Sequence, residues 1–174
     1  MKKTIAIVAT LLLTHSAVAQ TKDSIDVSRF MAVYDYLCRT KVGKTGEAIT
    51  DSAKIALLVG EKHSMQMEYT MFAYKVLDDR GKLWDAMRYS TIHIPRITTN
   101  FPEEGMMRII EPLFPHLYAM SETVTPIKWE LGDDTLSVAG YLCQNASCAY
   151  GGRTWHVWYT EEVASTAGPW CLQG

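Results

Sequence analysis

Short extended segments separated by turn residues fill the last third of the chain, and this pattern constrains the fold more than any other. Gly132-Asp133-Asp134 predicts a turn between segments 126–131 and 135–143. Gly151-Gly152 predicts a second turn before segment 154–160. Consecutive strands joined by such short turns run antiparallel, so this part of the chain is expected to form a β-meander.

The segment 154–160 is rich in aromatic residues on both of its faces. Side chains of a strand alternate between the two faces of a sheet. One face carries Trp155, Val157 and Tyr159, and the other carries His156, Trp158 and Thr160. We therefore expect either that both faces are covered or that one of them lines a cavity.

The rest of the chain favours strands with a single helix. Phe30–Cys38 alternates as a half-buried strand does, and 55–59 is a short apolar strand. The segment 41–50, with two glycines, is expected to be a loop, and 67–77 is expected to be a helix. Prolines exclude a long helix between residues 94 and 116, where they occur at Pro95, Pro102, Pro112 and Pro115.

The predicted fold class is mostly β (α+β). It consists of an antiparallel meander sheet with one helix packed against it, and the sheet is either open or curved into a partial barrel. No repeat, low-complexity block or linker divides the chain. One domain over residues 20–174 is therefore expected.

Residues 1–19 have the three parts of a secretory signal peptide. Lys2 and Lys3 precede an apolar stretch at 5–13, and Ala17-Val18-Ala19 forms an A-x-A cleavage site before Gln20. The apolar stretch is shorter than the roughly 20 residues that span a bilayer. We expect an exported protein, periplasmic or associated with the outer membrane or cell surface, with no transmembrane segment after cleavage.

The charge of the chain argues against nucleic acid as a partner. The whole chain has a formal net charge of −2, and residues 1–19 carry two lysines but no acidic residue. The exported part is therefore more acidic than the whole chain. Binding to nucleic acid depends on clustered Lys and Arg side chains that neutralise phosphates, and no such cluster is present.

Four cysteines lie after the cleavage site, at Cys38, Cys143, Cys148 and Cys171. An even number of cysteines in an oxidising compartment favours disulfides, and three pairings are open. The competing interpretation is a metal site, but Cys143 and Cys148 have no second close Cys or His pair that would complete zinc spacing.

A resemblance to a known family rests on motifs spread over the last third. These are the runs 128–131 (KWEL), 140–148 (GYLCQNASC), 152–155 (GRTW), 157–160 (VWYT) and 168–170 (GPW). In order and spacing they resemble the GLPGLI family of exported Gram-negative proteins. Weaker likeness extends upstream through 56–60. The family has no settled biochemical role, so the resemblance implies an envelope protein without naming an activity.

The resemblance has two further implications. A family member would continue beyond Gly174 with the Gly-Leu-Pro-Gly-Leu-Ile signature, which implies that this chain is either a fragment of a longer protein or a shortened member. Loss of the following strands would leave 154–160 at a sheet edge. It also implies that 141–150 is one strand. Cys143 and Cys148 would then point to opposite faces, which favours distant disulfide partners over a local bond.

Two candidate sites follow from the residue pattern. His63, Met65 and Met67 would share one strand face and form a soft ligand set suited to Cu(I), unless the methionines are core residues beside a surface histidine. The aromatic strands suggest a site for an apolar small molecule, formed by Trp155, His156, Trp158 and Tyr141.

No catalytic signature is present, since the chain has no G-x-S-x-G, H-E-x-x-H, C-x-x-C or phosphate-binding loop. A non-enzymatic role without a cofactor is therefore favoured. The leading hypothesis is an envelope binding module for an apolar ligand or a partner protein. The alternatives are an accessory protein of an outer-membrane complex and a Cu(I)-handling protein.

Overall fold

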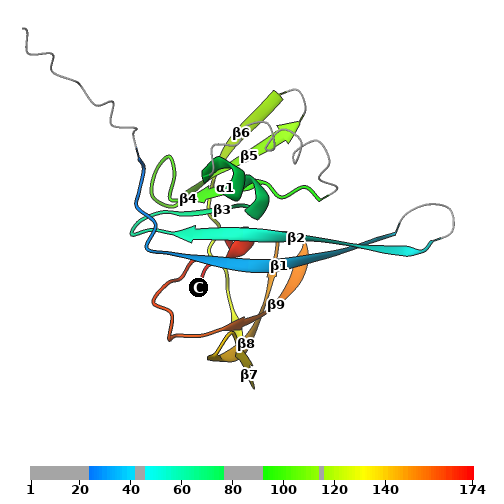
Figure 1. Cartoon of the computed structure of the whole chain (residues 1–174). Coiled ribbons are helices and arrows are strands. Elements are labelled where there is room, and N and C mark those ends of the chain that lie inside the picture. Colours follow the sequence, from blue (N-terminus) through cyan, green and yellow to red (C-terminus); the bar gives the residue numbers. More distant parts are fainter. Residues whose placement is uncertain (1–23, 42–45, 77–91, 114–115) are drawn as a thin grey trace, which may run out of the picture.

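A computed structural model of the chain describes residues 24–41, 46–76, 92–113 and 116–174. The signal sequence predicted at 1–19 lies outside these residues. The described part is mostly antiparallel β-structure arranged in two sheets, with one α-helix, as expected (Figure 1). Neither described sheet closes into a barrel.

The first sheet contains six strands that pair in the order in which they occur along the chain. They are β1 (Phe30–Lys41), β2 (Ala48–Val59), β3 (Ser64–Glu68), β4 (Arg96–Thr99), β5 (Met106–Leu113) and β6 (His116–Thr123). The two strands predicted at 30–38 and 55–59 are confirmed, but the loop predicted at 41–50 is wrong at both ends. β1 extends to Lys41 and β2 begins at Ala48, because the two strands stay in register along their whole length.

The middle of the first sheet is buried on both faces. Consecutive residues Ile55, Ala56 and Leu57 of β2 are at most 2% exposed, although neighbouring residues of a strand point to opposite faces. Both faces of the sheet are therefore covered at this point.

The helix α1 (Tyr69–Val76) contacts β2 and β3, close to the place expected for it. It begins two residues later than predicted because Met67 and Glu68 still pair with β2. The Glu68 carboxylate accepts hydrogen bonds from the backbone N–H groups of Thr70 and Met71, both at 3.0 Å. These bonds satisfy two of the N–H groups that lack a partner at a helix start. The last residue of the predicted helix, 77, lies outside the described residues.

The second sheet contains three strands, β7 (Glu130–Val138), β8 (Tyr141–Tyr150) and β9 (Arg153–Tyr159). The turn predicted at Gly151-Gly152 is confirmed, since both glycines have positive φ between β8 and β9. The single strand implied for 141–150 is also present.

The turn predicted at Gly132-Asp133-Asp134 is wrong, because β7 runs through these residues with an irregularity between Leu131 and Thr135. Side chains of β8 satisfy the backbone there: Gln144 Nε2 donates to the Gly132 carbonyl (2.6 Å), and Asn145 Oδ1 accepts from the Asp134 N–H (3.1 Å). A Cβ at Gly132 would lie 2.3 Å from Asn145, so this glycine permits close approach of a side chain rather than a turn. The hairpin turns instead at Ala139 and Gly140, both of which have positive φ.

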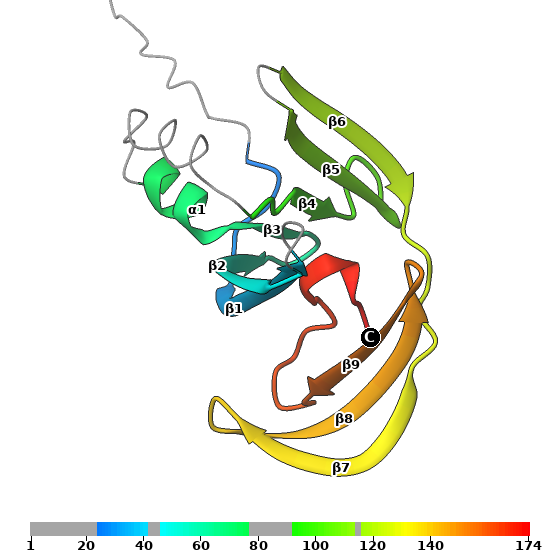
Figure 2. The same ribbon diagram turned by 90° about the vertical axis from the view of Figure 1, so that its right-hand side faces the viewer.

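The C-terminal segment, residues 160–174, lies between the two sheets and includes the short 3-10 helix η1 (Pro169–Cys171) (Figure 2). Cys171 packs with Ile97 of β4 and Met107 of β5. The Trp170 N–H donates to Oε1 of the buried Gln66 at 2.6 Å, across 104 residues of sequence. The Trp129 indole N–H donates to the Gln173 carbonyl at 2.8 Å. The segment therefore joins the six-stranded sheet to the start of the three-stranded sheet.

Candidate functional site

The three-stranded sheet presents two different faces, which the strand register identifies. One face, which we call inner, carries Gln144, Cys148, Tyr150, Trp155 and Tyr159. These residues share a face because they pair across β8 and β9 or alternate along one of these strands. This face is turned toward the C-terminal segment. Burial, together with the neighbouring Cys171 and Glu122, raises the pKa of Tyr150.

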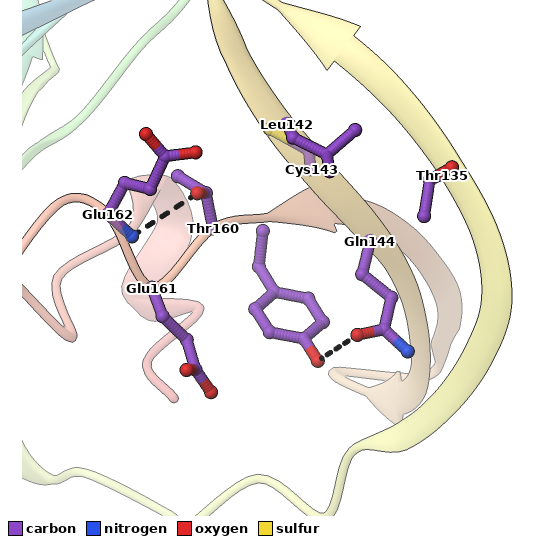
Figure 3. A pocket seen from close by; sticks show the side chains of 8 residues that line it. Thr135, Leu142, Cys143, Gln144, Thr160, Glu161 and Glu162 are labelled. Atoms are coloured by element: carbon purple, nitrogen blue, oxygen red, sulfur yellow. Dashed lines mark hydrogen bonds between the residues drawn. The ribbon is translucent and has the colours of Figure 1, made fainter.

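A hollow of about 320 Å³ opens on the inner face at the end of β9 (Figure 3). The Tyr159 hydroxyl and Gln144 Oε1 form a hydrogen bond of 3.1 Å across it. Its lining consists of Thr135, Leu142, Cys143, Gln144, Tyr159, Thr160, Glu161 and Glu162.

The hollow is lined by both apolar and charged residues. Leu142 and the Tyr159 ring provide apolar surface, whereas Glu161 and Glu162 are exposed carboxylates. The volume is at the lower end of the range of about 300–1,000 Å³ for small-molecule sites. An acyl chain placed here would take water away from two carboxylates, which costs free energy. The hollow is therefore a poor lipid site.

The outer face of the three-stranded sheet is exposed and apolar. Four large side chains lie on it, with exposed fractions of 40–48%: Leu136, Val138, Tyr141 and Trp158. Val138 pairs with Tyr141 across β7 and β8, and Trp158 pairs with Asn145 across β8 and β9. Of the two alternatives expected for 154–160, coverage of both faces is wrong, because His156 and Trp158 are exposed on the outer face, whereas a cavity on one face is present, since Tyr159 lines the hollow.

The structure divides the four residues predicted to bind an apolar ligand. Tyr141, the exposed His156 and Trp158 share the outer face. Trp155 lies on the inner face, half-buried, with its indole N–H donating to the Tyr150 carbonyl at 3.1 Å. None of the four lines the hollow.

Two residues of the outer face, Leu136 and Val138, did not emerge from the sequence. They are two positions apart, so they share a face of any strand that contains both. The misplaced turn at 132–134 concealed their relation to Tyr141, because the hairpin that pairs them turns at Ala139-Gly140.

The residues predicted to bind Cu(I) have other partners in the described part of the chain. Met65 and Met67 do share a face of β3, but Met67 is 7% exposed and pairs with Ala56. His63 Nδ1 lies 3.3 Å from Asp26 Oδ2, and the His63 ring packs edge-on against Phe101 at 6.5 Å. No observation favours copper binding, which stays a prediction.

The turn between β2 and β3 holds the carboxylate of Asp26. Its carboxylate accepts hydrogen bonds from the N–H groups of Lys62 and His63, both at 2.9 Å. These bonds lower the pKa of Asp26 far below its usual range. A Cβ at Gly60 would clash with the same carboxylate, so a larger residue there would displace the Asp26 side chain from its hydrogen bonds. The site is an anchor for the segment that precedes β1.

All four cysteines are free thiols in this structure. Cys143 pairs with Leu136 on the outer face, whereas Cys148 pairs with Trp155 on the inner face, so the two point in opposite directions. Burial raises the pKa of Cys148, and burial with the neighbouring Glu122 raises the pKa of Cys171 to about 11. Cys171 Sγ contacts Met107 Sδ at 3.1 Å. The disulfides stay a prediction.

The described residues contain neither a cluster that could bind a metal ion nor a helix that could span a membrane. Within these residues no three His, Cys, Asp or Glu side chains are grouped so that they could hold a metal ion. No helix in the same part of the chain has the length and apolar character needed to cross a membrane.

Comparison with known proteins yields little. No family model matches the chain, and no curated protein matches it. Among solved structures, that of PNGF-II in a C2 space group is similar over 77% of this chain, with 11% sequence identity and a TM-score of 0.48. The match spans 21% of the PNGF-II chain. This likeness is too weak to bear on function, and the resemblance to the GLPGLI family stays a prediction.

Proposed function

We propose that this chain is an exported cell-envelope protein that acts by docking a partner protein onto the outer face of its three-stranded sheet. The observation that carries the proposal is the exposure of Leu136, Val138, Tyr141 and Trp158 on one face. Contiguous exposed apolar surface of this kind marks interaction sites in soluble proteins.

The space between the sheets supports a docking role over a carrier role. The C-terminal segment occupies it, with Cys171 packed on Met107 and Trp170 bonded to Gln66. A lipid carrier needs an apolar cavity that encloses most of its ligand. The hollow beside Glu161 and Glu162 does not have that character.

The composition of the outer face fits a protein partner better than a small apolar molecule. Aromatic side chains alternate there with uncharged polar ones, namely Asn145, Ser147 and His156. Interfaces between proteins have this mixture, with aromatic residues enriched and charged residues depleted at the centre. The outer face is the convex side of a curved sheet (Figure 2), and such a face buries too little of a small ligand's surface.

The cellular location that we propose is supported by the first nineteen residues and by the likeness to an exported family. The apolar stretch and the A-x-A site support export, and the motifs of the last third support a Gram-negative envelope. Together they make an envelope protein the expected partner.

Site-specific photo-crosslinking in a Gram-negative host tests the proposal. A photoreactive phenylalanine analogue is placed at Tyr141 or Trp158, and at Leu117 of β6 as a control that is 69% exposed. We expect one discrete product with an envelope protein from positions 141 and 158, and none from 117. Leu136→Asp should abolish the product formed from position 141, whereas Leu117→Asp should leave it unchanged.

Two results would overturn the proposal. One is a crosslinking pattern that does not distinguish position 141 from 117 or does not respond to Leu136→Asp. The other is a lipid that co-purifies in native mass spectrometry and is lost on Leu142→Asp, which would assign the function to the hollow.

A further inference from the structure

Trp158 and Asp134 lie in one row across the outer face of the three-stranded sheet, with β8 between them. Trp158 of β9 pairs with Asn145 of β8. On its other side Asn145 contacts β7, where its Oδ1 accepts a hydrogen bond from the Asp134 N–H at 3.1 Å and its Nδ2 donates to Asp134 Oδ2 at 3.5 Å. The Asp134 carboxylate is therefore held on the same face as the Trp158 indole.

Both ends of this row are accessible. The Trp158 side chain is 44% exposed, and within the described residues no aromatic ring or cation contacts its indole. Asp134 is exposed, and no ion pair with its carboxylate is found in the described part of the chain. An aromatic surface and a carboxylate are thus both available to a partner.

The fixed charge of the outer face has one sign. Alternation assigns to this face the even-numbered residues of β7 and β9 and the odd-numbered residues of β8, and the pairs on either side of the irregularity in β7 keep this alternation. These residues include two carboxylates, Glu130 and Asp134, and no lysine or arginine. The face therefore attracts a cationic group and repels an anionic surface.

We propose that the partner docked on the outer face inserts an arginine side chain between Trp158 and Asp134. A guanidinium is planar, so it stacks on an indole while its fork of N–H groups pairs with a carboxylate. Neighbouring strands lie about 4.8 Å apart, which places the Cα atoms of residues 134 and 158 roughly 10 Å apart. One guanidinium fills that span between the two side chains.

The arrangement selects arginine over lysine and is prepared before the partner arrives. A lysine ammonium is a compact charge without a flat surface or paired N–H groups. Asn145 holds Asp134 through two hydrogen bonds, which lowers the cost of ordering the carboxylate on binding. Tryptophan and arginine are also enriched among the residues that dominate binding between proteins. The inference rests on the proposed function, because it names the group that the same face recognises.

Photo-crosslinking from position 141 tests the inference, since Tyr141 reports docking from outside the row. Asp134→Lys replaces an ion pair by a repulsive contact and should reduce the product about tenfold or more. Trp158→Leu keeps an apolar side chain but removes the aromatic ring, and should also reduce it. Asp133→Lys makes the same charge change at an exposed neighbour that has no hydrogen bond to Asn145 in the described structure, and should change the product less than about twofold.

The crosslinked partner gives a second measurement. Mass spectrometry of the product identifies the partner segment, which should contain an arginine close to the crosslinked residue. That segment is synthesised as a peptide, and its binding to the purified protein is measured by fluorescence anisotropy. Replacement of its arginine by lysine should weaken binding to the wild type about fivefold or more, but should have little effect on binding to Asp134→Asn.

The outcomes separate this inference from the proposed function. A product that is lost with Leu136→Asp but survives both Asp134→Lys and Trp158→Leu would overturn the arginine and leave docking on the outer face intact. A partner segment without arginine, or equal losses from Asp133→Lys and Asp134→Lys, would also overturn it. Absence of any product from position 141 would overturn the proposed function and the inference with it.

Circular dichroism of each variant identifies any that fail to fold. If Asp134→Lys misfolds, Asp134→Asn takes its place, because it has nearly the same shape and removes only the charge. It should still reduce the product, and an unchanged product from a folded Asp134→Asn chain would contradict the inference.

Discussion

The two sheets of this protein differ in how far their central strands are buried. In the six-stranded sheet, α1 and the C-terminal segment contact the central strands, and Ile55, Ala56 and Leu57 are buried. In the three-stranded sheet, burial is confined to β8, where Cys143, Ala146 and Cys148 lie. The large side chains of β7 and β9 stay partly exposed.

The centre of the first sheet therefore acts as a scaffold, whereas the three-stranded sheet, like the edge strands β1 and β6 of the first, keeps apolar side chains exposed. A strand covered on both faces contributes stability, whereas a strand exposed on one face keeps apolar area that a partner can bury. The C-terminal segment is the link, because its Trp170 bonds to the first sheet and its Gln173 to Trp129 beside the second. The contrast leads to three predictions of decreasing effect.

The largest difference in stability is expected between two leucine-to-alanine substitutions, one in each sheet. Leu57→Ala leaves a cavity at a residue that is 2% exposed and should cost about 2–5 kcal/mol of unfolding free energy. Leu136→Ala, at 48% exposed, should cost about 1 kcal/mol or less. Urea unfolding followed by circular dichroism measures both. Equal losses would show that the two sheets are equally packed.

A smaller effect is expected at the link between the sheets. Gln66→Leu has nearly the same shape but leaves the Trp170 N–H without its acceptor, which should cost about 1–3 kcal/mol. Gln144→Leu is the matched change on the inner face of the second sheet. It should cost less, because water in the adjacent hollow can replace the lost hydrogen bonds. Thermal unfolding of both variants ranks them, and a larger loss from Gln144→Leu would contradict the assignment.

The smallest effect on stability is expected from lowering the pH, and it concerns Asp26, which is bonded to the turn between β2 and β3. The pKa of Asp26 is far lower in the folded chain than its usual value of about 4, so its stabilising contribution is complete above that pH and declines as the pH falls further. Asp26→Asn should lower the melting temperature at neutral pH, and the difference from wild type should shrink as the pH falls from about 4 to about 2. A difference that stays constant over this interval would contradict the role given to Asp26.

Local pattern was enough to predict the strands at 30–38 and 55–59, the single helix, the turn at Gly151-Gly152 and the antiparallel arrangement. Each of these depends on neighbours in sequence, through alternation or turn chemistry. The turn expected at Gly132 shows where such reasoning fails. This glycine is needed for Asn145, thirteen residues away, and a close approach between strands leaves no sign in the sequence around it.

The candidate site was predictable only in part. Tyr141, His156 and Trp158 were identified as a group and share the outer face, while Trp155 belongs with them in sequence but not in space. Leu136 and Val138 joined the group only when the position of the hairpin turn was known.

By itself, the sequence determined which segments are extended, which face each side chain shares with its neighbours, and that the strands pair antiparallel, because alternation and turn residues act over a few positions. Only the tertiary structure decided that there are two sheets, and which of their faces are covered. That outcome depends on the path of the C-terminal segment between the sheets. The contact between Trp170 and Gln66 spans 104 residues, and it forms only when the C-terminal segment packs against the six-stranded sheet.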